Sequence, residues 1–389
     1  MSTARTAQTF APPVMEARRW VEGRPEEPPL INVSQAAPVA PPPPPMLEAM
    51  AEFVLTDPSS HLYGPVLGLE ELRAEVAIQS ANRYGGRIAP AQVAITSGCN
   101  EAYTAAMAAL CGEGDEVILP LPWYFNHKMA NDMAGIRTVP LGPGPGLIPD
   151  PEEAAALITE RTRAIVLVTP NNPSGVEYPP EVMRRFFELA KEHGLRLIVD
   201  ETYRDFHSGE GAPHDLFAGP DWPDVLVHLY SFSKAYRLTG HRVGAMIASA
   251  RLLAEVEKYL DTVTICPAQL GQKAALWGMR NLAPWLAGER LEVLARRQAI
   301  VDGFPRLAAK GWALLGCGAY FAYVEHPFEL ASDALAKRLA QEAGVLLLPG
   351  TMFMPEGHPD ARRQLRIAFA NLDVPGVGVL FDRLEGFAA

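Results

Sequence analysis

Between residues 92 and 249, short apolar runs alternate with helical stretches, and this alternation limits the fold more than any other feature of the sequence. The runs are often β-branched and are followed by turn signals. They are QVAIT (92–96), EVILP (116–120), RAIVLVT (163–169), LRLIVD (195–200), VLVHLYS (225–231) and VGAMIAS (243–249). Runs this apolar on both faces suit a parallel sheet covered by helices on each side. We therefore predict a large α/β domain with a mostly parallel sheet.

The pattern changes on either side of this region. Residues 1–46 are rich in proline, which fixes φ and lacks an N–H donor, so we expect an extended arm that joins the smaller domain. After about residue 280 the pattern predicts a smaller α+β domain. Its expected elements are helices at 285–304 and 333–344 and short strands at 318–326 and 365–371. This gives three parts: the arm at 1–46, a large domain at 47–280 and a small domain at 281–389.

Composition excludes several classes of function. The net charge is −11 with no basic stripe, which argues against nucleic acid or an anionic membrane as a partner. No run approaches 18 apolar residues, so we expect no membrane span. The four cysteines have neither disulfide-framework nor metal spacing, which favours a reducing, cytoplasmic location and no metal site. The first 20 residues lack the apolar core of a secretory signal.

Polar side chains follow four of the predicted strands. The segments that follow are SGCNE (97–101), PNNPSG (170–175), DETY (200–203) and SFSK (231–234). Ligands of open α/β sheets bind outside the carboxyl ends of the strands. Small donors, an amide, a carboxylate, a phenol and a lysine are therefore expected to converge on one site.

Lys234 is the most informative of these residues. An amine at a strand end can form a Schiff base with a carbonyl once burial or a nearby cation lowers its pKa from about 10.4. Arg242 is such a cation, but together with the Ser231 hydroxyl it is better suited to bind a phosphate-like anion. The amides of residues 98–100, at a helix start, would bind the same anion. A lysine that merely reaches solvent at a strand edge would not need these neighbours.

Asp200 indicates which cofactor would fit. A carboxylate after an apolar strand either caps a helix or pairs with a buried cation, and a protonated pyridine ring requires such a partner. Tyr203 and Asn172 lie where they could bond the same ligand, and Pro173 and Gly175 shape the Asn172 turn. An ordinary Asn-Pro turn is the alternative interpretation of PNNPSG.

Taken together, PNNPSG, DETY and SFSKAYRLTGHRVG (231–244) resemble the class I and II aminotransferases, which are fold type I enzymes dependent on pyridoxal 5′-phosphate. The resemblance extends from about Ile31 to the C-terminus. It implies a seven-stranded sheet sandwiched by helices, transfer of an amino group between an L-amino acid and a 2-oxo acid, and a homodimer with shared active sites.

The resemblance also implies a role for each residue. Lys234 would hold the cofactor as a Schiff base and then move the substrate proton, with Asp200 on the pyridine nitrogen and Tyr203 acting beside them. Further cofactor contacts would be Asn172 and Tyr203 at the ring hydroxyl, Ser231, Arg242 and the amides of Gly98, Cys99 and Asn100 at the phosphate, Tyr124 (with Trp123 as the competing choice) on the ring, and Tyr63 at the partner subunit's phosphate.

Substrate contacts follow from the same resemblance. Arg366 would hold the α-carboxylate in a bidentate fork, next to Asn172. Ala36 stands where many members have a glycine and would narrow the pocket slightly. Residues 262–272 contain no arginine where members specific for dicarboxylates carry one, which argues against aspartate, although Thr264 could still contact the partner's phosphate. Tyr320 is expected either near the substrate or in the core.

Other readings of the motifs are possible. The same cofactor residues would serve a C–S β-lyase, a racemase or a decarboxylase. A non-enzymatic effector module fused to a DNA-binding domain is disfavoured because nothing before residue 46 resembles a helix-turn-helix. A nicotinamide dehydrogenase would need GxGxxG after the first strand, and the prolines of GPGPG (142–146) prevent the helix start that this motif requires.

Overall fold

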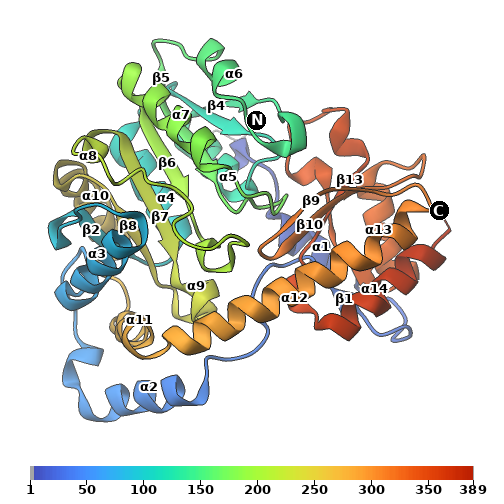
Figure 1. The fold of residues 1–389 in the computed structure, drawn as a ribbon, viewed down its shortest axis with the longest axis horizontal. Coiled ribbons are helices and arrows are strands. Elements are labelled where there is room, and N and C mark those ends of the chain that lie inside the picture. Colours follow the sequence, from blue (N-terminus) through green and yellow to red (C-terminus); the bar gives the residue numbers. More distant parts are fainter. Residues whose placement is uncertain (1–3, 389) are drawn as a thin grey trace.

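The computed structural model describes residues 4–388, and a seven-stranded sheet forms its larger part (Figure 1). In order across the sheet the strands are β2 (Val93–Thr96), β8 (Gly244–Ile247), β7 (Leu226–Ser231), β6 (Arg196–Asp200), β5 (Thr162–Val168), β3 (Glu116–Pro120) and β4 (Arg137–Leu141). All neighbours are parallel except that β8 runs antiparallel to both β2 and β7. The predicted α/β fold with a mostly parallel sheet is therefore confirmed.

Strand β4 is the one strand of this sheet that the sequence analysis did not identify. Its sequence, RTVPL, is half exposed and contains Pro140. Because β4 is an edge strand that pairs with β3 alone, the missing N–H of proline is tolerated there. The apolar pattern expected of a buried strand is absent for the same reason.

Helices cover both faces of this sheet, as alternate strand residues show. On one face Val93 and Ile95 share a core with α3 (Glu70–Tyr84), α7 (Pro180–Glu192) and α11 (Gln269–Asn281). On the other, Ala94 shares a core with α4 (Cys99–Leu110), α5 (Phe125–Ala134) and α10 (Ala250–Val263). The shorter helices of this part are α6 (Pro151–Ala156), α8 (Trp222–Val225) and α9 (Phe232–Ala235). Strands buried on both faces explain the continuous apolar runs.

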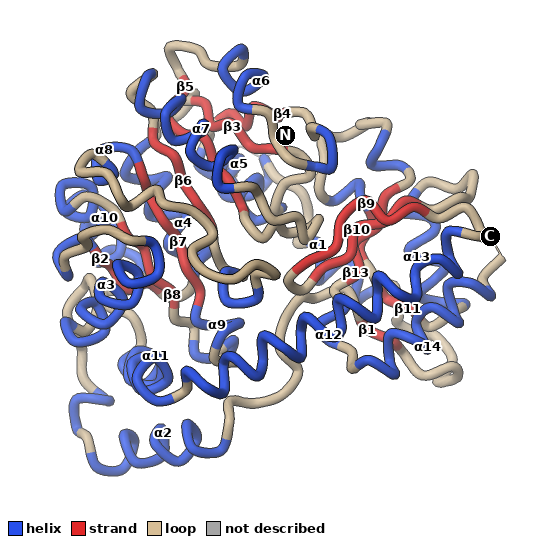
Figure 2. Tube along the Cα trace, viewed as in Figure 1, coloured by secondary structure: helices blue, strands red, loops and turns tan. Residues whose placement is uncertain are grey.

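A second, antiparallel sheet lies beside the first, and the long helix α12 (Ala283–Ala308) runs from near α11 along this second sheet, as Figure 2 shows. Its strand order is β12 (Leu348–Pro349), β13 (Gln364–Ile367), β10 (Phe321–Glu325) and β9 (Ala313–Gly318). Helices α12, α13 (Ser332–Glu342) and α14 (Val374–Gly386) complete a separate core around it. The expected α+β character of this region is thus present, and the boundaries drawn at 46 and 280 remain our proposal.

The N-terminal segment is less extended than the sequence predicted. Helix α1 (Pro13–Arg19) interrupts it, because proline is well tolerated in the first turn of a helix. Strand β1 (Ile31–Asn32) then pairs in parallel with β11 (Val345–Leu346), next to the smaller sheet. Helix α2 (Pro44–Thr56) begins within the proline run and packs against α11. None of the helices within residues 4–388 combines the length and the apolarity that a bilayer span needs.

Candidate active site

The carboxyl ends of β2, β5, β6 and β7 open into one cavity of about 430 Å³. Eleven of the residues singled out from the sequence line it: Ala36, Cys99, Asn100, Tyr124, Asn172, Asp200, Tyr203, Ser231, Lys234, Arg242 and Arg366. They come from segments spread over the whole chain and from both sheets. The convergence expected at the strand ends is therefore present.

Asp200 is the last residue of β6, and its carboxylate is buried. Oδ1 accepts a hydrogen bond from the Thr202 amide at 3.0 Å, and Oδ2 lies 3.3 Å from Nε2 of His127. Burial alone would raise the pKa of Asp200, but hydrogen bonding and charge at His127, with the Thr202 bonds, outweigh burial and lower the pKa below its ordinary value. The site thus holds an ionised carboxylate at neutral pH.

His127 was not predicted from the sequence, yet it lies directly against this carboxylate. Its ring stacks on Tyr103 at 3.9 Å between centroids and meets Tyr124 edge-on at 5.1 Å. His127 lies on α5, three residues after Tyr124, so the two side chains share one helix face. That spacing was the only available signal, and it becomes readable only once a helix is assigned from residue 125.

Lys234 lies on the single turn of α9 that follows β7. Burial first, and then repulsion by Arg242, lower the pKa of the Lys234 amine to about 8, against the attraction of Asp200 and Cys99. These are the two causes that the sequence analysis expected. About a tenth of the amine is therefore uncharged at pH 7, far more than at an ordinary lysine, and the uncharged form is the one that attacks a carbonyl.

Arg242 provides a cation without an acidic partner in the described part of the chain. Its guanidinium donates to the carbonyl oxygens of Thr239 at 3.1 Å and Ser97 at 3.3 Å, and it makes no ion pair. Gly98 lies directly beside it with φ of +92°, and a Cβ at that position would fall on the guanidinium. Glycine has no Cβ and adopts this φ without strain, so the Arg242 guanidinium can lie against the backbone at the start of α4.

Two of the three amides expected to bind an anion are free to do so. The Gly98 amide donates instead to the Thr96 carbonyl at 2.8 Å, whereas within residues 4–388 the amides of Cys99 and Asn100 have no partner. The Ser231 hydroxyl accepts from the Ser233 amide at 3.3 Å and keeps its own O–H available. An anion at the N-terminus of α4 would find these groups in addition to Arg242.

Arg366 lies on β13 and is only 2% exposed. One terminal nitrogen donates to Oδ1 of Asn172 at 2.9 Å and the other to the Ser34 carbonyl, while Nε has no partner among the described residues. Burial lowers the pKa of Arg366 to about 10, so the group is still charged at neutral pH. Since a buried, unpaired charge is costly, this guanidinium calls for an anionic ligand.

The tyrosines of the cavity are neutral phenols. Burial raises the pKa of Tyr124 to about 12 and that of Tyr203 well above its ordinary value. The Tyr124 hydroxyl accepts from the Asn126 amide at 2.8 Å. Trp123, the competing aromatic, is buried but does not line this cavity.

Comparison with known proteins identifies the family of this chain. Residues 28–384 match the family described as aminotransferase class I and II. The chain belongs to this family. It is a pyridoxal-phosphate-dependent aminotransferase, as the motifs around Asp200 and Lys234 implied, and the lyase reading is not favoured.

The related proteins are named after several different amino-acid substrates. The chain is 32% identical to "Aromatic aminotransferase ISS1" of Arabidopsis thaliana over 340 residues, covering 85% of this chain and 82% of that protein. It is 28% identical to "Aspartate aminotransferase" of Thermotoga maritima, covering 92% and 91%. Among solved structures, a methionine aminotransferase from Escherichia coli, YbdL, has a TM-score of 0.88 at 25% identity and full coverage of both chains.

Like Trp123, the tyrosines Tyr63 and Tyr320 and the threonine Thr264 lie outside the cavity of this aminotransferase. Tyr63 is 80% exposed. Tyr320 is buried and packs on Tyr203 at 5.3 Å between centroids, so it supports a cavity residue from behind. The Thr264 hydroxyl donates to the carboxylate of Glu101.

Helix α1 contributes cavity residues that the sequence analysis missed. The additional residues from the N-terminal segment are Pro12, Pro13, Val14, Met15, Arg18, Gln35 and Ala37. Arg18 donates to Oε1 of Gln35 at 2.7 Å and has no acidic partner within residues 4–388. No group of His, Cys, Asp or Glu side chains in the described part of the chain has the geometry of a metal site.

The lowered pKa of Lys234 predicts a pH-dependent effect on stability. Below pH 8 the amine is protonated in both states, so the folded state carries a buried charge; between 8 and the ordinary value of 10.5 only the unfolded state binds the proton. We expect cofactor-free Lys234→Met to melt a few degrees above the wild type at pH 7, with the difference shrinking from pH 8 to 10.5.

Lys258→Met is the control, because Lys258 is 70% exposed and pairs at the surface with Glu255. Thermal melts of the three proteins across this pH range measure the effect. A Lys234→Met advantage that is absent at pH 7, or that grows with pH, would contradict the described environment of Lys234.

Proposed function

We propose that this cavity binds pyridoxal phosphate and that its residues divide the work of transamination as the sequence suggested. The supporting observation is the set of charged groups: Arg366 and Arg242 lack acidic partners within residues 4–388, while Asp200 and Lys234 line the same cavity. The phosphate, the ring nitrogen and the carbonyl of this cofactor match Arg242, Asp200 and Lys234 in charge and chemistry, and the carboxylate of an amino-acid substrate matches Arg366. When bound, this cofactor supplies a reactive carbonyl and a ring that withdraws electrons from the substrate Cα.

In this proposal the cofactor is held mainly by residues at the carboxyl ends of β2, β3, β5, β6 and β7. Asp200, kept ionised, would pair with the ring nitrogen, and Asn172 and Tyr203 would bond the ring oxygen. Tyr124 lies against the ring. The phosphate would be bound by Arg242, Ser231 and the N-terminus of α4. There Gly98 leaves room beside the Arg242 guanidinium, and the free amides of Cys99 and Asn100 donate hydrogen bonds.

Lys234 and Arg366 would then act on the substrate. Arg366 would bind the α-carboxylate, since it lines the cavity, its terminal nitrogens have only the uncharged partners Asn172 and Ser34, and its Nε has no partner within residues 4–388. This fixes the Cα–H bond relative to Lys234. The Lys234 amine, with a pKa of about 8, accepts that proton and returns it near neutral pH.

We propose that the active unit is a homodimer. Several large apolar side chains are exposed in and just after helix α2 and at the end of α10: Leu55 at 83%, Leu62 at 65%, Tyr63 at 80% and Val263 at 57%. Exposed apolar groups of this kind favour a protein partner, and a second copy would bring Tyr63 to the neighbouring phosphate. The four cysteines are free, which agrees with the proposed cytoplasmic location.

The mixed lining of the cavity supports a proposal about the class of amino donor. Val14, Met15 and Phe125 accommodate apolar side chains, and Arg18 adds a cation that has no other role in the proposal. The segment 262–272 lacks an arginine, but Arg18 reaches the cavity from helix α1 instead. We therefore propose that donors with a distal carboxylate are accepted along with apolar ones.

The half-reaction tests the proposed function. Protein loaded with pyridoxal phosphate and mixed with single L-amino acids is expected to change its visible spectrum, release the matching 2-oxo acid in stoichiometric amount and recover on addition of a 2-oxo acid. Arg366→Met should lower kcat/KM for the donor about 100-fold or more, because a buried hydrogen-bonded charge is lost. No spectral change with any amino acid, or accumulation of ammonia, would contradict transamination.

Arg18 gives a separate prediction about the donor. Arg18→Gln should lower kcat/KM for donors with a distal carboxylate by about 10-fold, the cost of one charge-assisted hydrogen bond, and leave apolar donors unchanged. Arg19→Gln is the matched control, because Arg19 neighbours Arg18 on α1 but does not line the cavity. Equal effects on both donor classes, or equal effects of the two variants, would rule out this role for Arg18.

A further inference from the structure

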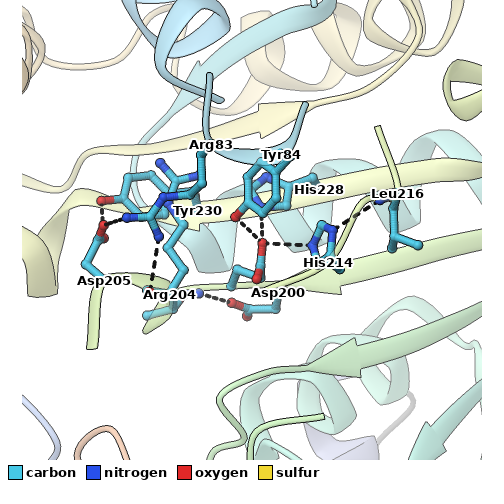
Figure 3. Close-up of polar contacts among 11 residues, drawn as sticks. Arg83, Tyr84, Asp200, Arg204, Asp205, His214, Leu216, His228 and Tyr230 are labelled. Atoms are coloured by element: carbon cyan, nitrogen blue, oxygen red, sulfur yellow. Dashed lines mark hydrogen bonds and ion pairs between the residues drawn. The ribbon is translucent and has the colours of Figure 1, made fainter. Parts of the chain in front are cut away.

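A buried polar network lies behind the cavity, on the face of the sheet covered by α3 (Figure 3). Its centre is the carboxylate of Glu201, the residue after Asp200, which is fully buried. Oε2 of Glu201 accepts hydrogen bonds from the Tyr84 hydroxyl and from Nε2 of His228 at 2.8 Å, and lies 3.2 Å from Nε2 of His214. Burial raises the pKa of Glu201, but His214 and His228 more than offset burial and hold this pKa well below its ordinary range.

The histidines are oriented to donate to this carboxylate. The Leu216 amide donates to Nδ1 of His214 at 3.3 Å, so Nδ1 is the acceptor and the proton facing Glu201 is on Nε2. Tyr84 comes from α3, His228 from β7 and His214 from the loop before α8. One carboxylate oxygen thus joins three separate elements to the end of β6.

The network continues along the same segment. Arg204 lies over the Tyr230 ring, with its guanidinium carbon 3.7 Å from the ring centroid. The Tyr230 hydroxyl donates to Asp205 at 2.7 Å, and Arg83 pairs with the other oxygen of Asp205 at 3.1 Å. Arg83 also donates to the Arg204 carbonyl at 3.2 Å. Side-chain contacts therefore hold residues 201–205 against β7 and α3.

Each of these anchors neighbours a cavity residue in the sequence. Asp200, Tyr203 and Ser231 line the cavity, and the adjacent residues, Glu201, Arg204 and Tyr230, enter the network behind it. This alternation follows from strand geometry for the pair at the end of β6, because successive side chains point to opposite faces. A displacement of the network would therefore move the cavity residues directly.

Backbone hydrogen bonds alone do not hold residues 201–205 against β7. The register between β6 and β7 ends at Asp200 and Leu229, and the last backbone bond runs from the Glu201 amide to the Leu229 carbonyl at 2.9 Å. Beyond that bond, side chains are the remaining links between residues 201–205 and β7. They act at the place where Asp200 and Tyr203 must be held.

Stability is a poor explanation for such a network. Within residues 4–388, Oε1 of Glu201, Nδ1 of His228 and two nitrogens of Arg204 are buried without partners. Well-packed apolar side chains of similar volume would often be as stable or more so, since buried charges lose their hydration. Fixing a single arrangement of the strand ends is the better reason for these groups.

We propose that Glu201, together with Tyr84 and His228, is a positioning residue that fixes Asp200 and Ser231 relative to one another in the cavity. This inference rests on the proposed function, in which Asp200 faces the ring nitrogen and Ser231 the phosphate of one rigid ligand. A misplacement of about 1 Å at a reacting group can cost roughly 100-fold in rate. The network keeps both contacts in register without touching the ligand.

The test uses Tyr84→Phe, which removes one hydroxyl and keeps the ring stacked on His214, and Glu201→Gln, which removes the charge. Ser332→Ala is the matched control, because it deletes a buried hydroxyl at the start of α13 that bonds the Ala361 carbonyl at 2.7 Å, outside both cavity and network. If Glu201→Gln does not fold, Tyr84→Phe alone carries the comparison.

Two readouts separate positioning from general stability. In cofactor-free protein, hydrogen exchange of peptides covering residues 199–206 should be at least several-fold faster in the network variants and unchanged in Ser332→Ala. In protein loaded with pyridoxal phosphate, the network variants should shift the pH midpoint of the cofactor's visible band and lower kcat about 10-fold, with the donor KM within about threefold.

The outcomes decide between the two explanations. Melting temperatures that fall as in Ser332→Ala, with unchanged exchange at 199–206 and an unchanged pH midpoint, would overturn the positioning role. Faster exchange without any cofactor band in the wild type would instead refute the proposed function and leave the mechanical link between Glu201 and Asp200 intact. Faster exchange with a shifted midpoint supports the proposal.

Discussion

A guanidinium buried without an acidic partner is the constraint on which this structure depends. Arg366 is almost fully enclosed, and its two hydrogen-bond partners, Asn172 and the Ser34 carbonyl, come from segments more than 130 residues apart in the chain. Neither partner carries a charge. The fold therefore keeps a cation in the cavity that is free to pair with an anion, and the two sheets must stay together for the cavity to exist.

The cavity residues are then supplied by the geometry of the larger sheet. Parallel strands bring their carboxyl ends to one edge, which explains why Asn172, Asp200 and Ser231 meet although each follows a different strand. Successive side chains at the end of β6 point to opposite faces of the sheet. Asp200 enters the cavity and contacts His127, while Glu201 enters the polar network behind it.

The features of the fold and the site that could be predicted were those marked by residues adjacent in the sequence. Strands buried on both faces and the residues following them were readable because apolar runs and turn residues are contiguous in the sequence. Strand β4 was missed because an edge strand carries no such run and tolerates Pro140. The role of His127 could not be predicted, since its partner Asp200 is 73 residues away and nothing local distinguishes a histidine in the core from one on a carboxylate. Helix α1 was read as extended because its prolines mask a short helix, and with it the contribution of Arg18 to the cavity was lost.

The most direct test of the central claim is to identify the residue that binds the cofactor covalently. The chain has only seven lysines, at 128, 191, 234, 258, 273, 310 and 337. Protein loaded with pyridoxal phosphate can be reduced with borohydride, digested and analysed by mass spectrometry. The account predicts one pyridoxyl group per chain, on Lys234, and no label in Lys234→Ala. Stoichiometric label on another lysine, or an unlabelled wild type, would contradict it.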